Sequence, residues 1–592
     1  MPVPPAHPGL RVAALVLVAA AMTSLLARPA SGQALPVPPE PPGGGGGQAL
    51  ALATTHMVSA ANPYATEAGL EVLRTGGSAV DAAIAVALVL NLVEPQSSGI
   101  GGGGFLVHWD AVRKEVRTYD GRETAPAAAD PRRFLREGQP MPFEEAVFSG
   151  LSVGVPGLVR LMELAHRRHG RLPWARLFEP AIRLAEEGFR VSPRLNLMLR
   201  LQGASRFAPA ARSYFFDDVG SERPVGHLLR NPEFADTLRR IAESGADAFY
   251  KGPIAEAIVK AVAGAPNHAG DMTLADLGGY EAKERPALCI TYRARRICGM
   301  GPPSSGGLTV AMTLKLLEPF DLGRGPQAAM RTGALHVIAE AEKLAYADRD
   351  RYIGDPDFVS VPAGLLDDNY LAQRRRLIDP GSAMGRAEAG RPPGLSQRAF
   401  GADTTLENAG TTHFSIVDRD GNAVAMTATI EQAFGARIWA AGFLLNNELT
   451  DFAFRPGDER AGLAANAAAG GKRPRSSMAP TLVLGADGEF EAALGSVGGS
   501  AIIYYVVKAL VALIDWQLDA QAAAALLSFG SRGTAFEIEA GSSTVWYALN
   551  LRPLGHRIAL TLPVSGTHII VRRGGLLEGG ADPRREGVAR GD

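Results

Sequence analysis

The spacing of apolar residues changes near residue 411, and this change limits the folds open to the chain. Beyond it, two pairs of alternating apolar and polar runs are each joined by Asp-Gly, a strong signal for a β-hairpin. The paired runs are 414–417 with 423–430, and 481–485 with 490–494. Helices before and after antiparallel hairpins predict an α+β fold whose sheets are covered by helical layers. A four-layer αββα sandwich fits this order, although periodicity alone does not single it out.

Helical spacing extends over much of the first 351 residues. Asn62-Pro63 is typical of a helix start and Gly76-Gly77 of its end. Ser78 opens a second helix, which is apolar nearly all round from Ala82 to Leu90 and is therefore expected to be buried. Further helices are predicted at 158–168, 174–187, 232–244, 254–263, 334–351 and 500–516.

The composition is that of a soluble globular protein. Apolar residues make up 46% of the 592 positions and charged residues 20%, and the formal net charge is −1. The chain has no basic stripe with interleaved aromatic residues, so a nucleic-acid partner is not expected.

The first 50 residues have two distinct parts. Arg11 precedes an apolar run, Val12 to Leu26, and then small residues, an order typical of a secretory signal peptide. We therefore predict a signal peptide over 1–33 and a periplasmic or secreted protein without membrane contact after signal removal. An uncleaved membrane anchor is the alternative, although the run is short for one. Residues 34–50 are rich in proline and glycine and are predicted to be a disordered tether.

The chain contains two cysteines, Cys289 and Cys298. A two-residue turn at Arg293-Ala294 would place them opposite each other in a hairpin, at a non-hydrogen-bonded position where side chains lie closest. A disulfide would suit an oxidising compartment, and two unpaired core thiols are the alternative. Two cysteines alone do not make a zinc site, so either role is structural.

Three patterns suggest other chemistry but lack the context that it needs. Residues 99–104 match the dinucleotide motif G-x-G-x-x-G, yet they follow a helix and lead into a strand, the reverse of the required order. Residues 150–154 match the serine-hydrolase motif G-x-S-x-G, but no downstream histidine is marked out as a partner, so a tight turn is the simpler interpretation. His336 and Glu340 share a helix face with Glu342 nearby, and we interpret them as a structural pair because no other metal ligands cluster there.

Residues 410–414, Gly-Thr-Thr-His-Phe, lie where a loop enters the first predicted strand. A self-cleaving N-terminal-nucleophile hydrolase needs a Ser, Thr or Cys at the head of a strand, after a bond that can be broken. The Thr411 hydroxyl would attack the carbonyl of Gly410, which has no side chain to obstruct it, and water would hydrolyse the ester. The freed Thr411 would carry its own base, an α-amine with a pKa of roughly 7.7–8.0. His413 is therefore interpreted as structural.

Six motifs resemble signatures of the gamma-glutamyltranspeptidases and occur in that family's order, over roughly Ala51 to Arg584. They are residues 94–105 (EPQSSGIGGGGF), 410–415 (GTTHFS), 445–452 (LNNELTDF), 472–478 (KRPRSSM), 495–499 (GSVGG) and 580–584 (GADPR). The resemblance implies the αββα fold of N-terminal-nucleophile hydrolases. It also implies autocleavage into a large subunit, 51–410, and a small subunit, 411–592.

The resemblance further implies a role for each motif residue. Thr411 is similar to the nucleophile and Thr429 to the threonine that orients it, while Gly498 and Gly499 resemble the pair whose N–H groups stabilise an oxyanion. Substrate-binding roles are implied for Arg122, Ser476 and Ser477 on an α-carboxylate, and for Asp451, Glu431 and Glu448 on an α-ammonium.

The implied activity is two-step acyl transfer from glutathione or a related γ-glutamyl compound to water, an amino acid or a peptide. No cofactor and no metal are implied, and the expected partners are small-molecule substrates and the chain's own second subunit. One alternative is an acylase for glutaryl-type β-lactam side chains, which lack the ammonium that Asp451 and Glu431 would hold. The other is a secreted binding or structural protein that never matures, against which intact Thr411 and Thr429 argue.

Four departures from the family's pattern concern the surroundings of the site. Val497 stands where proline is common, and Ala501 stands where a larger polar residue occurs. Residues 528–532 do not contain the Pro-Arg-His sequence that is expected there. Residues 452–471 contain no tyrosine or tryptophan, so a lid over the pocket is expected to be short and the site more open.

Overall fold

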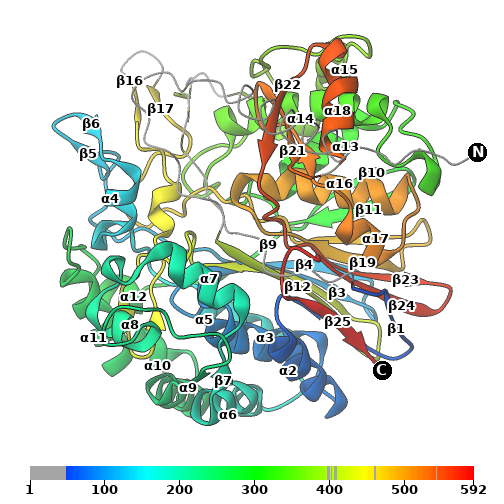
Figure 1. Ribbon diagram of the computed structural model, residues 1–592. Helices are drawn as coiled ribbons and strands as arrows, with labels where there is room; N and C mark the ends of the chain where they lie inside the picture. The colour runs from blue at the N-terminus through cyan, green and yellow to red at the C-terminus, as the bar shows by residue number, and fades with distance from the viewer. Residues whose placement is uncertain are drawn as a thin grey trace, which may run out of the picture. The chain divides into compact units, whose positions relative to one another are not determined.

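Two seven-stranded antiparallel sheets pack face to face in the computed structural model (Figure 1). The structure describes residues 48–592 except 396–399, 402, 404, 406–409, 459–461 and 542. The first sheet has the order β1 (Ala51–Ala53), β24 (Leu576–Ala581), β23 (His568–Arg573), β19 (Phe490–Gly495), β18 (Thr481–Leu484), β11 (Arg295–Gly299), β10 (Leu288–Tyr292). The second has the order β25 (Val588–Gly591), β2 (Met57–Ala60), β12 (Thr411–Val417), β13 (Ala423–Thr429), β3 (Gly103–Asp110), β4 (Glu115–Gly121), β9 (Lys283–Arg285).

Helices cover the outer face of each sheet. Against the second sheet lie α2 (Pro63–Arg74), α3 (Ala79–Val93) and α5 (Leu158–His169), joined by α6 (Glu179–Glu187) and α9 (Pro232–Ser244). Against the first sheet lie α13 (Gly306–Leu317), α16 (Ile502–Ile514) and α17 (Ala520–Ala525), and α14 (Thr332–Tyr352) packs on α13. The remaining helices are α4 (Phe143–Val147), α7 (Pro193–Gln202), α8 (Pro209–Phe215), α10 (Asp247–Tyr250), α11 (Pro253–Ala263), α12 (Leu274–Gly278), α15 (Asp368–Arg375) and α18 (Thr544–Leu551).

The apolar core is layered in the same way. Met57, Trp109 and Val417 of the second sheet meet Leu482 and Ile570 of the first, and they fill the space between the sheets. Two larger clusters join each sheet to its helices. The predicted αββα sandwich is confirmed.

Short strands complete the structure outside the two sheets. They pair as β5 (Leu135–Arg136) with β6 (Gln139–Pro140), β7 (Phe189–Arg190) with β8 (Leu228–Leu229), β14 (Trp439–Ala440) with β15 (Phe443–Leu444), and β16 (Gly457–Asp458) with β17 (Gly462–Leu463). A three-stranded sheet contains β20 (Phe529–Gly530), β21 (Ala535–Glu539) and β22 (Arg557–Thr561).

Local signals placed many element ends correctly. The side chain of Asn62 caps α2 by accepting from the Tyr64 N–H, and Ser78 forms a capping box with Asp81 at the start of α3. The helix predicted at 174–187 is instead a 3₁₀ turn, Trp174–Phe178, followed by α6. Pro180 explains the break, because it has no N–H to continue the first segment and favours the start of a new helix.

The cysteine hairpin has the geometry that the spacing predicts. Arg293 and Ala294 both have positive φ (48° and 64°), as a two-residue hairpin turn requires, and Cys289 faces Cys298 in the register of β10 and β11. The two cysteines form a disulfide in the structure.

The predicted signal peptide and residues 34–47 of the predicted tether lie outside the described residues. The last three tether residues, 48–50, pack against the rest of the domain: the Gln48 side chain donates to the Gly587 carbonyl, and Leu50 contacts an apolar cluster. Across the described parts of the chain, no helix combines the length and apolar character needed to cross a membrane.

The three misleading patterns have structural explanations. The glycine run joins α3 to β3, and a Cβ atom on Gly102 would lie 2.0 Å from the Thr429 carbonyl oxygen, so the run permits close backbone packing. Ser152 is buried and donates to the Val147 and Ser149 carbonyls, so it is no exposed nucleophile.

The residues around His336 form a buried polar cluster. Within the described chain, His336, Glu340 and His556 are the one group close enough to suggest a metal site. Glu340 is paired with Lys343 at 2.8 Å, and His336 is hydrogen-bonded to His556 and to the Asp379 carbonyl. Protein groups therefore bind His336 and Glu340, but Nδ1 of His556 is buried without a hydrogen-bond partner. The sequence did not predict that His556 joins this cluster, because it lies 220 residues from His336 in the chain.

Candidate active site

Thr411 is the first residue of β12 and faces Thr429, the last residue of β13. The Thr429 hydroxyl donates to the Gly410 carbonyl oxygen at 2.8 Å and accepts the Glu431 N–H at 2.8 Å. The carbonyl that Thr411 would attack is thus polarised by the neighbouring strand. β12 begins three residues earlier than its apolar alternation predicts, because Thr411 to His413 already pair with β13.

The backbone around this bond leaves no room for a side chain at position 410. A Cβ atom on Gly410 would lie 2.0 Å from the Glu431 carbonyl oxygen and 2.6 Å from the carbonyl carbon of Gln432. Glu431 itself has a φ of 73°, a left-handed conformation that costs a non-glycine residue free energy. Such strain is typical of functional sites, where the surrounding structure holds a residue in place.

Gly498 and Gly499 form the turn that leads into α16. Their φ angles are 135° and 58°, and a Cβ atom on Gly498 would lie 2.7 Å from the Tyr505 ring. A short 3₁₀ turn, Gly499–Ala501, precedes the helix, so the predicted helix at 500–516 begins two residues late. Backbone N–H groups at this end carry the positive end of the helix dipole, which favours a developing negative charge.

The substitutions noted around this turn are accommodated by packing. Val497 and Ala501 are buried apolar side chains. Arg532 donates to the Ser500 hydroxyl at 2.8 Å, and the Tyr346 hydroxyl donates to the Ser500 carbonyl at 2.5 Å. The segment at 528–532 therefore braces the start of α16 without a Pro-Arg-His sequence.

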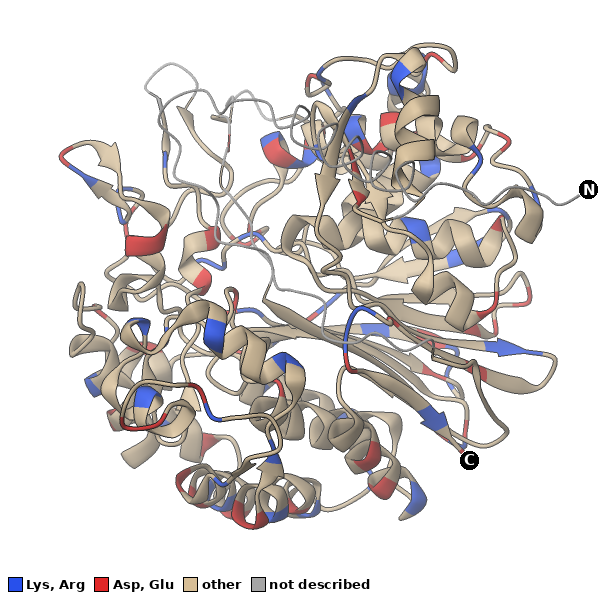
Figure 2. Ribbon diagram, viewed as in Figure 1, with Lys and Arg blue, Asp and Glu red and all other residues tan. Residues whose placement is uncertain are grey.

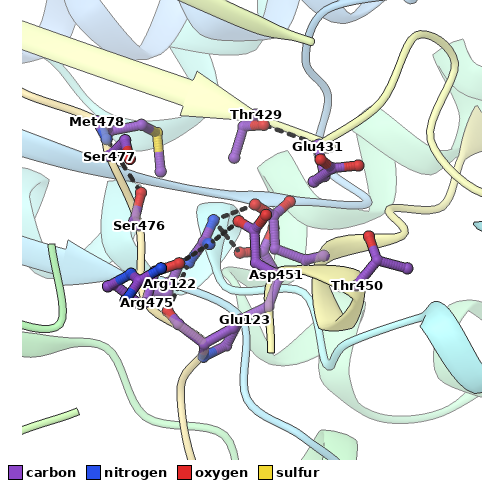
Figure 3. Close-up of polar contacts among 12 residues, drawn as sticks. Arg122, Glu123, Thr429, Glu431, Thr450, Asp451, Arg475, Ser476, Ser477 and Met478 are labelled. Carbon is purple, nitrogen blue, oxygen red and sulfur yellow. Dashed lines mark hydrogen bonds and ion pairs between the residues drawn. The ribbon is translucent and has the colours of Figure 1, made fainter. Parts of the chain in front are cut away.

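Arg122 is buried, with 1% of its surface exposed, and it is held at the end of β4 by several acceptors (Figure 3). Its guanidinium forms ion pairs with Glu448 and Asp451. Nε donates to the Pro474 carbonyl at 3.1 Å, and Nη2 donates to the Arg475 carbonyl at 3.0 Å. The sequence-based interpretation assigns the guanidinium and the carboxylates to opposite ends of a substrate. In the structure they also bind each other.

Carboxyl groups outnumber cations in this pocket. Glu123, Glu431 and Glu448 are all buried, and burial raises the pKa of each; the neighbouring Asp451 and Glu448 raise the pKa of Glu431 further. Burial works to lower the pKa of Arg122, but Glu448, Asp451 and Glu123 outweigh it and raise that pKa. One Glu431 oxygen accepts the Asn447 side-chain amide, and the other is buried without a hydrogen-bond partner.

Ser476 and Ser477 lie on the strand-like segment that follows Arg475 (Figure 3). Arg349 of α14 donates to the Ser477 hydroxyl oxygen at 2.6 Å, and the Met478 N–H donates to the Ser476 hydroxyl oxygen at 3.2 Å. These contacts fix both hydroxyl oxygens beside Arg122.

One small pocket brings these groups together. Of the residues named from the sequence, it contains Arg122, Thr411, Thr429, Glu431, Glu448, Asp451, Ser476, Ser477 and Gly499. Gly498 adjoins it through Gly499, and Gly410 through Thr411.

Sequence reasoning missed several residues that position this pocket. Asn446 donates to the carbonyls of Gly101 and Gly154 and accepts two backbone N–H groups, which fastens the turn that carries Glu448. Asn447 binds Glu431. Both lie within the motif at 445–452, but nothing in the sequence distinguishes their side chains from loop amides.

Comparisons with known proteins identify the family of the chain. The family model described as gamma-glutamyltranspeptidase matches residues 65–591. A glutathione hydrolase proenzyme of Bacillus subtilis (strain 168) is 36% identical over 550 residues, covering 90% of this chain and 91% of the relative. One from Escherichia coli (strain K12) is 37% identical over 545 residues, covering 89% and 90%.

Two solved structures are similar in fold. A cephalosporin acylase from Bacillus halodurans matches with a TM-score of 0.80 and 26% identity, covering 95% of this chain and 99% of its own. The gamma-glutamyltranspeptidase of Helicobacter pylori matches with a TM-score of 0.52 and 36% identity, covering 55% of this chain and 91% of its own. With a family model matched over most of its length and relatives of this identity, the chain belongs to the gamma-glutamyltranspeptidase family of enzymes.

Proposed function

We propose that this chain cleaves itself between Gly410 and Thr411 and then acts as a gamma-glutamyltransferase and glutathione hydrolase. The observation that carries the proposal is the position of Thr411. It heads β12 in a pocket with one guanidinium, two serine hydroxyls and several carboxyl groups, and its partner Thr429 donates to the carbonyl of the bond to be cut.

Maturation would proceed by an N-to-O acyl shift. The Thr411 hydroxyl oxygen attacks the Gly410 carbonyl carbon, and the Thr429 hydroxyl stabilises the negative charge that develops on the carbonyl oxygen. The C–N bond breaks, the nitrogen takes up a proton, and an ester joins Gly410 to Thr411. Water then hydrolyses the ester, leaving a carboxylate on Gly410 and a free α-amine on Thr411.

Turnover would reuse the same hydroxyl. The neutral amine of Thr411 accepts the hydroxyl proton while the oxygen attacks the γ-carbonyl of the donor. The N–H groups of Gly498 and Gly499 would stabilise the oxyanion, and the departing amine takes the proton. Water or an acceptor amine then attacks the γ-glutamyl ester and restores Thr411.

Charge supports an α-amino acid as the group that is recognised. Arg122, Ser476 and Ser477 suit a carboxylate, while Asp451 and Glu431 suit an ammonium. A γ-glutamyl group brings both charges and leaves the net charge of the pocket unchanged. A glutaryl group would bring only a negative charge into a pocket already rich in buried carboxyl groups.

The likeness to a cephalosporin acylase favours a second candidate, an acylase for glutaryl-type side chains. Parallel assays on γ-glutamyl and glutaryl p-nitroanilides separate the two activities. We expect kcat/KM to be higher for the γ-glutamyl substrate. Preference for the glutaryl substrate would overturn the proposal in favour of the acylase.

We also propose that the protein is exported and that its two chains stay together. The order of charge, apolar run and small residues at 11–34 and the disulfide at Cys289 and Cys298 support export. Mass spectrometry of protein purified from its native host tests both claims. A single chain that still carries residues 1–33 would refute them, because it would be a protein that never matures.

A further inference from the structure

An exposed apolar surface lies on α18 and β22. Val545, Trp546 and Leu549 of the helix are 60%, 55% and 62% exposed, and Leu560 and Leu562 in and after the strand are 65% and 47% exposed. Together these five residues, here called the α18–β22 patch, expose on the order of 500 Å², near the upper limit for the largest apolar patch of a monomeric protein.

Contacts at both ends of the helix hold the five residues on neighbouring segments. The Thr544 hydroxyl donates to the Glu539 carbonyl at 2.7 Å, and the Ala540 N–H donates to the Thr561 carbonyl at 2.9 Å. The start of α18 therefore meets the end of β22. A short turn, 552–556, joins the other end of the helix to the start of the strand.

The opposite side of α18 is already covered. Thr544 and Leu551 are buried, and Tyr547 packs against the apolar cluster of the helical layer. A helix with apolar side chains on all sides is normally buried on all sides. The outward side chains of α18 thus have the composition of a contact surface.

The charges beside the patch decide which kind of partner fits. α18 has no charged residue, as Figure 2 shows, and the sequence has no Asp or Glu between Glu539 and Glu578. Arg552 and Arg557, which follow the helix, are both exposed. In a two-fold dimer formed through this surface, the arginines of one copy would face those of the other and repel them. An anionic lipid surface would instead attract them.

We propose that the α18–β22 patch docks on an anionic lipid surface. Trp546 and the aliphatic side chains enter the boundary between headgroups and acyl chains, and Arg552 and Arg557 contact lipid phosphates. Helices that lie at the boundary between headgroups and acyl chains typically combine tryptophan and leucine with arginine. The contact is peripheral, and it differs from the sequence-based expectation of no membrane contact after signal removal.

Vesicle sedimentation tests the proposal. Protein without residues 1–33 is used, so that the apolar run at 12–26 cannot contribute. Wild type is expected to bind vesicles of phosphatidylcholine and phosphatidylglycerol in equal parts, and to bind phosphatidylcholine alone more weakly. The double variant Trp546→Ser/Leu549→Ser should lose affinity for the anionic vesicles by about tenfold or more, because apolar burial supplies much of the affinity of such helices.

Two further variants control the experiment. Val225→Ser/Leu228→Ser removes two other exposed apolar side chains and should bind like wild type. Arg552→Gln/Arg557→Gln should lose the preference for anionic vesicles and its dependence on salt. Unchanged melting temperatures establish that each variant is folded.

Three results would overturn the proposal. If wild type binds neither kind of vesicle, lipid docking is excluded. It is also excluded if the Trp546→Ser/Leu549→Ser variant binds as wild type does. The third is a wild-type dimer in light scattering that becomes a monomer in the same variant, because a second copy would then be what covers the patch.

Discussion

Replacing Thr429 by valine should slow self-cleavage while the protein still folds. Valine has the shape of threonine without the hydroxyl, so the change removes one donor to the Gly410 carbonyl at 2.8 Å. In the ground state a neutral hydrogen bond of this kind contributes about 0.5–1.5 kcal/mol. The contact should strengthen as the carbonyl oxygen becomes an oxyanion, and losing one oxyanion donor typically costs about 2.7–4 kcal/mol. We therefore expect Thr429→Val to mature about 100-fold more slowly.

The same substitution has a second effect that must be separated from the first. The Glu431 N–H loses its acceptor, and a buried unsatisfied donor costs about 1–3 kcal/mol of stability. Thr412→Val is the matched control, since the Thr412 hydroxyl is buried one residue from the bond and has no hydrogen-bond partner. It should mature at the wild-type rate with equal or higher stability. Thr429→Ser, which keeps the hydroxyl, should restore most of the rate.

A time course on denaturing gels, with mass spectrometry of the fragment that begins at Thr411, measures these rates. Thermal melting of each substitution in the Thr411→Ala chain, which stays uncleaved, reports the stability effect independently. If Thr429→Val matures as fast as Thr412→Val, the hydrogen bond to Gly410 has no part in cleavage, and the reasoning fails.

Four other changes test the remaining parts of the site. Thr411→Ala should stay a single chain without activity on gels and in γ-glutamyl anilide assays, and any fragment ending at Gly410 would contradict this. Arg122→Lys keeps the charge but loses bidentate hydrogen bonding to a carboxylate, so KM for a γ-glutamyl donor should rise about 10- to 100-fold with a smaller change in kcat. An unchanged KM would show that Arg122 does not bind the carboxylate. The folded-state pKa of Glu431 is raised, so its contribution to stability is present at low pH and is lost as pH rises through that pKa. Glu431→Gln should therefore raise the melting temperature more at pH 8 than at pH 5. We also expect the KM of wild type to rise as pH falls and protonates Glu431, and Glu431→Gln should remove this dependence. Cys289→Ser opens a bridge with a sequence separation of 9 and should lower the free energy of unfolding by about 2–3 kcal/mol in denaturant titrations, with kcat/KM unchanged.

Local sequence signals predicted those elements whose causes are also local. The cap at Asn62, the turns at Asp420-Gly421 and Asp487-Gly488, and the facing cysteines each depend on residues within a few positions of one another. The predicted bounds of α9 match the structure because Asn231 caps it and Gly245 follows its end. Such features need no knowledge of the rest of the chain.

The internal pairing of the site could not be predicted in this way. Arg122 reaches Glu448 and Asp451 across 326 and 329 residues, and no periodicity connects them. The close approach of Gly410 to Glu431 and the left-handed conformation of Glu431 arise only once β12 and β13 are paired. Sequence motifs named these residues, but burial and long-range contact decide what each of them can do.

The strand order gives a reason for both products of cleavage to remain one enzyme. In the second sheet, β12 and β13 of the proposed small subunit lie between β2 and β3 of the proposed large subunit, and β13 pairs with β3 over its whole length. Separating the subunits would break these ladders and expose the apolar layer between the sheets.

The charges in the pocket give a second reason for the two products of cleavage to stay together. Arg122 comes from the large subunit, while its partners Glu448 and Asp451 come from the small one, and dissociation would leave buried charges without their partners. Upstream of the bond, Asp403 pairs with Arg475 at 3.0 Å, and Asn466 donates to both Asp403 and the Asp451 carbonyl. The segment just upstream of the bond thus braces the loop that carries the carboxylates. Cutting one peptide bond would free the amine of Thr411 without loosening the groups that hold the substrate.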